Sequence, residues 1–162
     1  MSDFAVVRAY RRVRGALFGR AEAGVVEPDD PGLVVVVAGY DDVESCSAAL
    51  ARGAGSDPRW AADRQALLRH PMVVPAAAVE EVVGIGSLAG YSPVEPVPAI
   101  RAEAVGSPAA GEVLLVLARS QVLDALHCSQ ERSRMAGLAQ RHGGRALGWD
   151  ALQPDPMGGA AR

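Results

Sequence analysis

The stretch VVVVAGYDDVESCS, residues 34–47, decides the predicted fold. It indicates a buried strand, a loop that contains aspartates, and a helix with Cys-Ser in its first turns. The stretch LLVLARSQVLDALHCS, residues 114–129, repeats this order with a loop that is two residues longer. Because a further extended segment follows each helix, the two copies predict two β-α-β halves. Two such halves form an α+β, ferredoxin-like sandwich, in which a four-stranded antiparallel sheet carries its helices on one face.

The first half begins with the apolar run at residues 33–40, which is typical of a strand buried on both faces. Asp41 or Asp42 is placed to cap the helix that follows. Glu44 completes a capping box if Asp41 is the cap. We expect the helix to end at Gly53, because glycine commonly terminates helices.

Extra helices are expected between the two halves, over residues 57–90. Asp57 and the proline after it are a helix start signal, which predicts a helix that continues until Pro71. A second helix is predicted from Pro75, because valines recur at helical spacing after it. Glycines weaken the C-terminal half of that second helix.

The second half is predicted to contain three strands and one helix. An edge strand is expected at residues 99–105 and a buried strand at 113–120, separated by a turn. Asp124 is placed to cap a helix that runs through Arg141, and residues 145–152 form the last strand.

The N-terminal residues are expected to lie outside this domain. Residues 1–24 predict a basic amphipathic helix, followed by a linker at 25–31, the α+β domain at 32–154 and a flexible tail at 155–162. Two interpretations of the helix remain. It binds an anionic surface, either lipid or RNA, or it packs its apolar stripe on its own domain and leaves the arginines in water. The candidate partner contacts in this helix are Arg8, Arg11, Arg12 and Arg14.

The charge is uneven and the cysteines are few. The net charge is −3, but the first twenty residues carry +4, which leaves −7 on the remainder. No apolar run approaches the roughly 20 residues that a membrane span needs, and arginines interrupt any signal-peptide core. Cys46 and Cys128 show no C-x-x-C spacing and fall on apolar helix stripes. We therefore expect free, buried thiols in a cytoplasmic protein.

Trp149 is one of only two tryptophans in the chain. In the predicted last strand, Leu147 and Trp149 share a face. That face is either the helix-covered core, which the scarcity of aromatic residues favours, or the exposed face, where Trp149 would be a partner contact. Trp149 therefore joins the arginines as a candidate contact.

The sequence shows no set of residues typical of catalysis. Gly84, Gly86 and Gly90 form a loose dinucleotide-binding pattern, but prolines after Gly90 forbid the helix that this motif needs. None of the three histidines has the short paired spacing of zinc ligands. The strands also lack the alternating aromatics that bind RNA on a sheet. No catalytic, cofactor-binding or metal-binding residue is predicted, and nucleic-acid binding by the sheet is not expected.

The C-terminal stretch GEVLLVLARSQVLDALHCSQERSRMAGLAQRHGGRALGWDA, residues 111–151, resembles the closing β-α-β of the regulator of ribonuclease E activity B family. The similar features are an apolar strand, a helix that ends in Leu-Ala before a glycine, and a final strand with Gly-Trp. Residues 88–95, LAGYSPVE, are similar to the family's helix-to-strand turn. The residues that carry the main resemblance are Leu138, Ala139, Gly143, Gly148 and Trp149.

The resemblance implies a ferredoxin-like fold and a non-enzymatic regulator that binds an RNA-degrading enzyme. Members of that family are strongly acidic, whereas this chain is mildly so. The expected function is a cytoplasmic, protein-binding regulator, and the partner that the resemblance implies is a ribonuclease. The alternative is a small-molecule-binding or enzymatic α+β domain that uses an open sheet face as its pocket. The sequence leaves the oligomeric state open.

Overall fold

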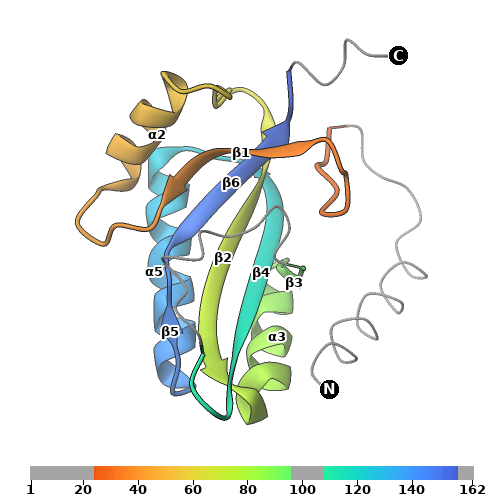
Figure 1. The fold of residues 1–162 in the computed structure, drawn as a ribbon, viewed down its shortest axis with the longest axis vertical. Helices are drawn as coiled ribbons and strands as arrows, with labels where there is room; N and C mark the ends of the chain where they lie inside the picture. Colours follow the sequence, from red (N-terminus) through yellow and green to blue (C-terminus); the bar gives the residue numbers. More distant parts are fainter. Residues whose placement is uncertain (1–23, 96–107, 157–162) are drawn as a thin grey trace.

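A computed structural model describes residues 24–95 and 108–156 of the protein. They form an α+β fold with an open antiparallel sheet of six strands and three helices (Figure 1). The strands are β1 (Leu33–Gly39), β2 (Gln65–Pro75), β3 (Ser92–Pro93), β4 (Glu112–Val122), β5 (Arg145–Ala146) and β6 (Trp149–Pro154). The helices are α2 (Cys46–Ala54), α3 (Val79–Leu88), which follows a 3-10 turn at Ala76–Ala78, and α5 (Ala125–Arg141).

The strand order of the sheet is β1-β6-β2-β4-β3, and β5 pairs with β2 beside this path. Helix α2 connects β1 to β2 across β6, and α5 connects β4 to β6 across β2. The predicted α+β class is therefore confirmed, and each of these two connections joins strands that have one other strand between them. The predicted number of four strands is too low, because β3 and β5 add short pairings. A ferredoxin-like sheet has the first strand of each unit in its centre, whereas here the second strands, β2 and β6, lie there.

Strand β2 takes part of the chain that the sequence assigns to a helix ending at Pro71, so that prediction is wrong. Residues 57–64 form turns and bends, and the chain then crosses the centre of the sheet. β2 pairs with β4 along its length, with β6 over residues 67–69 and with β5 over 72–73. Pro71 lies where β2 changes partner from β6 to β5, a position where a missing N–H is tolerated in a central strand.

Helix α2 begins later than predicted. Its N-cap is Ser45, whose Oγ accepts a hydrogen bond from Ala48 N at 3.2 Å. The prediction that Asp41 or Asp42 caps this helix is therefore wrong. Gly53 lies in the last turn of α2, where a Cβ would be 2.9 Å from Cβ of Val37. A side chain at this position would push the helix away from β1.

The helices predicted after Pro75 and after Asp124 are confirmed. Helix α3 lies where the valine spacing after Pro75 predicts it, and Gly86 lets it approach β4, since a Cβ there would be 2.9 Å from Leu117 Cδ1. Helix α5 has the predicted N-cap: Asp124 Oδ1 accepts a hydrogen bond from His127 N at 2.8 Å. The position of α3 therefore follows from its valine spacing, and the start of α5 follows from its capping aspartate.

The last extended segment is divided by a break. Gly148 has φ +121°, a conformation that strains residues with a side chain, and it separates β5 from β6. Leu147 lies in this break and donates its N–H to Pro71 O at 2.9 Å. The expectation that Leu147 and Trp149 share one face of a single strand therefore does not describe this segment.

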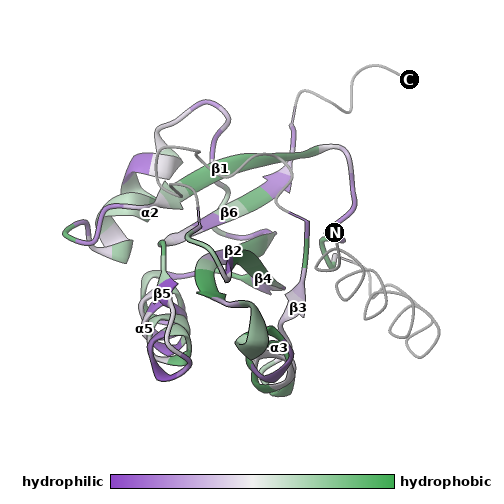
Figure 2. Cartoon of the chain, turned by 60° about the horizontal axis from the view of Figure 1, so that its bottom comes forward, coloured by the Kyte–Doolittle hydropathy of each residue, from purple (hydrophilic) through white to green (hydrophobic). Residues whose placement is uncertain are grey.

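The helices lie on one face of the sheet, with α3 and α5 standing apart beneath it (Figure 2). One core cluster joins α2 and α5 to β1, β2 and β6 around Trp149. A second cluster joins α3 and α5 to β2 and β4. A smaller cluster on the other face contains Leu67, Ala118 and Leu152, with Val26 packed against them.

Trp149 and both cysteines belong to the first cluster. Trp149 is 0% exposed, so of the two faces considered for it, the core is the correct one. Cys46 at the start of α2 and Cys128 in α5 are free and buried, which confirms the expectation for both thiols. The predicted strand at 99–105 and the predicted N-terminal helix lie outside the described residues.

Candidate functional site

The loop between β1 and α2, residues 40–45, presents an apolar side chain to solvent. Asp41 Oδ1 accepts a hydrogen bond from Val43 N at 2.9 Å, and Asp41 O accepts one from Glu44 N at 3.2 Å. Val43 is 92% exposed, and the side chain of Asp42 beside it is 98% exposed. The loop thus combines an exposed apolar group with carboxylates.

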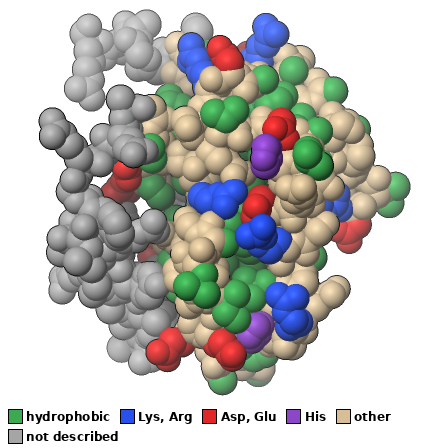
Figure 3. Space-filling model, turned by 180° about the vertical axis from the view of Figure 1, so that it is seen from behind, with side chains coloured by type: hydrophobic (Ala, Val, Ile, Leu, Met, Phe, Trp, Pro, Cys, Tyr) green, Lys and Arg blue, Asp and Glu red, His purple; other side chains and the backbone are tan. Residues whose placement is uncertain are grey.

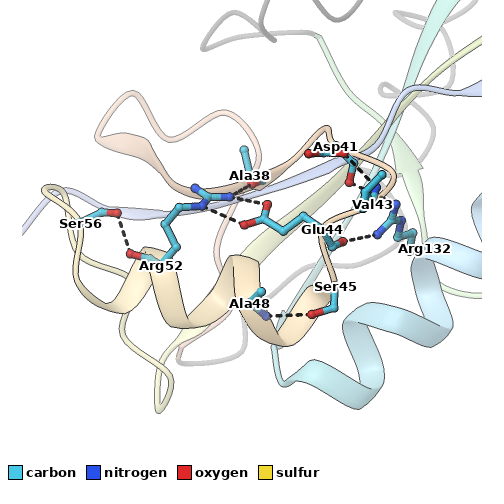
Figure 4. Close-up of polar contacts among 9 residues, drawn as sticks. All are labelled: Ala38, Asp41, Val43, Glu44, Ser45, Ala48, Arg52, Ser56 and Arg132. Carbon is cyan, nitrogen blue, oxygen red and sulfur yellow. Dashed lines mark hydrogen bonds and ion pairs between the residues drawn. The ribbon is translucent and has the colours of Figure 1, made fainter.

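The Glu44 carboxylate fixes this loop to α2 (Figure 4). Glu44 Oε1 and Oε2 accept hydrogen bonds from Arg52 Nε and Nη2 at 3.0 and 2.7 Å. Arg52 Nη2 also donates to Ala38 O at 2.8 Å, at the end of β1. The hydrogen bond from Arg52 lowers the pKa of Glu44, so this carboxylate remains charged and the contact is a paired, charge-assisted one.

Arg132 of α5 holds the loop from its other side (Figure 4). Its Nη1 donates to Glu44 O at 2.9 Å, and its Nη2 donates to Asp42 O at 3.0 Å. Nη2 also lies 3.3 Å from Asp42 Oδ1. One guanidinium therefore satisfies carbonyl groups that a turn would otherwise expose to water alone.

Tyr40 anchors the first residue of the loop to a buried ion pair. Its Oη donates to Asp150 Oδ2 at 2.9 Å. Arg69 Nε and Nη2 donate to Asp150 Oδ1 and Oδ2, each at 2.7 Å, and both side chains are buried. The loop is thus fixed by β6 through Tyr40, by α2 through Arg52 and by α5 through Arg132.

Exposed carboxylates lie at both ends of β1. Glu27 and Asp30 belong to the turn before the strand, where Asp30 Oδ1 accepts a hydrogen bond from Gly32 N at 2.8 Å. Asp41 and Asp42 belong to the loop after it. The strand between them, LVVVVAG, carries no charge. β1 is therefore an apolar strand with negative charge at each end.

A second polar cluster joins α3 to α5. Glu131 is a buried carboxylate that accepts a hydrogen bond from Tyr91 Oη at 2.8 Å and lies 3.4 Å from Arg119 Nη2. Arg119 also donates to Ala89 O at 2.9 Å and to Gln121 Oε1, and its guanidinium carbon lies 4.9 Å from the Tyr91 ring centroid. Figure 3, which shows the molecule from behind, has cationic and anionic side chains next to one another near the centre of the view.

The groups of this second cluster are engaged with one another. Burial, followed by the hydrogen bond to Glu131, raises the pKa of Tyr91, so the phenol stays neutral and donates. Arg119 uses its donors on Gln121, Ala89 and Glu131. The cluster therefore holds the C-terminal end of α3 against α5, and it offers few free polar groups to a ligand.

His70 lies in the core beside Tyr91, with ring centroids 5.7 Å apart. Burial, and then the charge of Arg119, lowers the pKa of His70 to about 3, so its imidazole is neutral. Within the part of the chain that the structure describes, no three His, Cys, Asp or Glu side chains gather where they could hold a metal ion. His70 is therefore part of the protein core.

Of the predicted contact residues, Trp149 alone belongs to the described part of the chain. Arg8, Arg11, Arg12 and Arg14 lie outside the described residues. Trp149 is buried beneath α2 and presents no surface to a partner.

Sequence reasoning missed the roles of Val43, Arg52 and Arg132. In the run Asp-Asp-Val-Glu, the sequence pattern assigns a role only to the acidic residues, as helix-capping groups. The apolar valine between polar residues is the signal in the sequence that could have indicated an exposed contact. The Arg132 contacts join residues 88 to 91 positions apart, which no local pattern reveals.

Comparison of the chain with protein-family models, with curated protein sequences and with solved structures found no match. Among the described helices, none has the length and apolar character required to cross a membrane.

Proposed function

We propose that the protein is a non-enzymatic regulator that binds another protein at the acidic ends of β1. The observation that carries the proposal is the loop at residues 40–45, where Val43 and Asp42 are exposed on a backbone fixed by three elements. A preorganised loop loses little conformational freedom on binding, so more of the contact energy appears as affinity. Carboxylates around an apolar contact favour a basic partner and speed encounter with it.

The sequence resemblance implies that the partner is an RNA-degrading enzyme of the ribonuclease E type. The proposed location of the protein is the cytoplasm. Free, buried Cys46 and Cys128 fit a reducing compartment. On this proposal the regulator covers or alters a basic region of the ribonuclease, and slower RNA cleavage is the result.

The test is an RNA-cleavage assay with the host's ribonuclease E–type enzyme and the full chain. The chain should bind the enzyme and slow cleavage. Binding should weaken as salt rises, because charges separated by more than about 10 Å are largely screened at 0.1 M. Asp41→Asn with Asp42→Asn should weaken binding, whereas Glu80→Gln with Glu81→Gln, an exposed acidic pair on α3, is the matched control and should not.

Binding of free RNA by the folded body would contradict the proposal. A full-length variant in which Arg8, Arg11, Arg12 and Arg14 are all changed to Gln separates this possibility from an effect of the basic segment. If that variant still binds RNA in a filter assay, the regulator proposal is wrong. Turnover of a substrate by the chain itself, or a small molecule held on the sheet face, would support the alternative of a ligand-binding or enzymatic domain.

A further inference from the structure

Strand β1 is an edge strand of the sheet. It pairs with β6 on one side, and no strand of the described residues pairs with its other side (Figure 1). An edge strand presents unpaired backbone N–H and C=O groups, which are a template for another strand. The outer edge of β1 is therefore a place where an extended segment can add to the sheet.

The side chains of β1 give this edge little protection. Proteins commonly block an edge with lysine, proline or an inward charge, and LVVVVAG contains none of these. A register shift between Val35 and Val37 and the hydrogen bond from Arg52 to Ala38 O modify the C-terminal half of the strand. The N-terminal half, around Val34 and Val35, is the more open part.

Val34 and Val35 extend the protein core to this edge on both faces of the sheet. Val34 packs against the cluster around Trp149, and Val35 packs against the cluster of Leu67 and Leu152. Both valines are only partly buried. An added strand with apolar residues in its centre would cover the exposed remainder of each valine and continue both clusters.

The charges at the ends of β1 discriminate between possible occupants. Glu27 and Asp30 precede the strand, and Asp41 and Asp42 follow it. If a second copy paired through β1, carboxylates would meet carboxylates whether the two strands ran parallel or antiparallel. Like charges placed opposite one another are destabilising, so self-pairing is disfavoured. A strand with basic residues at its ends meets the opposite charge.

We propose that the outer edge of β1 binds an extended segment of a partner protein, with an apolar centre and basic ends, as an added strand. The inference rests on the proposed function, since it assigns the site and the chemistry of the protein partner. Backbone hydrogen bonds supply affinity in this mode, and the side chains of the added strand supply selectivity.

The test uses the full chain and the synthetic peptide RRVTVTVRR. Amide hydrogen exchange by NMR should show slower exchange at Leu33–Gly39 when the peptide is added. EEVTVTVEE, with reversed end charges, should give no protection. RRVPPPVRR keeps the charges but has no backbone N–H on its three central residues, so it cannot pair along its centre on either side and should give none either.

Charge variants provide the second measurement. Asp30→Asn, Asp41→Asn and Asp42→Asn together should weaken binding of RRVTVTVRR by about tenfold, because exposed ion pairs contribute modestly and roughly additively. Glu80→Gln with Glu81→Gln should leave the affinity unchanged. Asparagine retains the oxygens that accept the loop hydrogen bonds, and thermal unfolding verifies that each variant folds.

The outcomes separate this inference from the proposed function. If the chain binds and slows the ribonuclease but no peptide protects β1, the edge inference is overturned and the regulator proposal stands. If RRVTVTVRR protects β1 while the chain neither binds nor slows the ribonuclease, the edge inference stands and the proposed partner is wrong. A dimer in sedimentation, with β1 amides protected without peptide, would show that a second copy occupies the edge and would overturn the inference.

Discussion

At the scale of single residues, Trp149 contributes the largest fully buried side chain. Trp149→Ala should lower the free energy of unfolding by about 3–5 kcal/mol, because it leaves a cavity in the core. Trp149→Phe should cost less, since it keeps an aromatic ring and removes an indole N–H that has no hydrogen-bond partner in the described structure. In a Trp60→Phe background, Trp149 emission should be blue-shifted and insensitive to quencher. Red-shifted, quenchable emission would place the indole at the surface.

Gly148 is needed where β5 ends and β6 begins. It has φ +121°, and a Cβ there would lie 2.5 Å from Gly39 O. Gly148→Ala should therefore lower the free energy of unfolding by about 2 kcal/mol or more. Gly111→Ala is the matched control, because Gly111 also has a positive φ, +83°, but no atom lies near its Cβ position. Equal losses in urea unfolding would show that the close approach to Gly39 has no energetic effect.

At the scale of elements, the contact between α2 and α5 protects both thiols. Burial raises the pKa of Cys128, and hydrogen bonding to Cys46 raises it further, so the reactive thiolate is scarce. A thiol reagent in native buffer should label neither Cys46 nor Cys128 appreciably, and unfolding should release both. Rapid labelling of both in the folded protein would contradict the packing of the two helices.

A buried ion pair between Arg69 and Asp150 joins β2 to β6. Asp150→Asn should lower the free energy of unfolding by about 3–5 kcal/mol, because it leaves the buried guanidinium without its carboxylate. Tyr40→Phe removes one hydrogen bond to the same carboxylate and should cost about 1 kcal/mol. Chemical denaturation of both variants measures the difference. A small effect of Asp150→Asn would mean that water reaches Arg69.

At the scale of the whole molecule, His70 makes stability depend on pH. Its pKa is about 3 in the folded protein, against an ordinary value of 6.5, chiefly because it is buried. Below pH 6.5 the unfolded chain binds a proton that the folded chain does not, so stability is lost as the pH falls from 6.5 toward 3. The slope from this group approaches about 1.4 kcal/mol per pH unit.

The control for this pH dependence is His70→Gln, which removes the titrating group. Urea unfolding between pH 7 and pH 4 should give a shallower loss of stability for the variant than for the unmodified protein. Parallel curves would indicate that carboxylates alone determine the acid sensitivity.

The sequence by itself determined the elements whose signals are local. The apolar run of β1, the strand before Asp124, the Asp124 cap and the valine spacing of α3 each specify their structure within a few residues. Propensity, capping and hydrophobic periodicity depend on residues a few positions apart, so they can be recognised in the sequence without knowledge of the tertiary structure. The carboxylates at the ends of β1 are visible in the sequence for the same reason.

Three features were decided only by the tertiary structure. Residues 65–75 form a strand, Trp149 faces the core, and contacts from other elements fix the loop at residues 40–45. A strand buried on both faces lacks alternation, so β2 is recognisable only between β4 and β6. Trp149 faces the core because α2 and α5 cover that side of β6. Arg132 reaches the loop from α5, across a sequence separation that no local pattern spans. Such contacts depend on which elements become neighbours, and that follows from the packing of the whole chain.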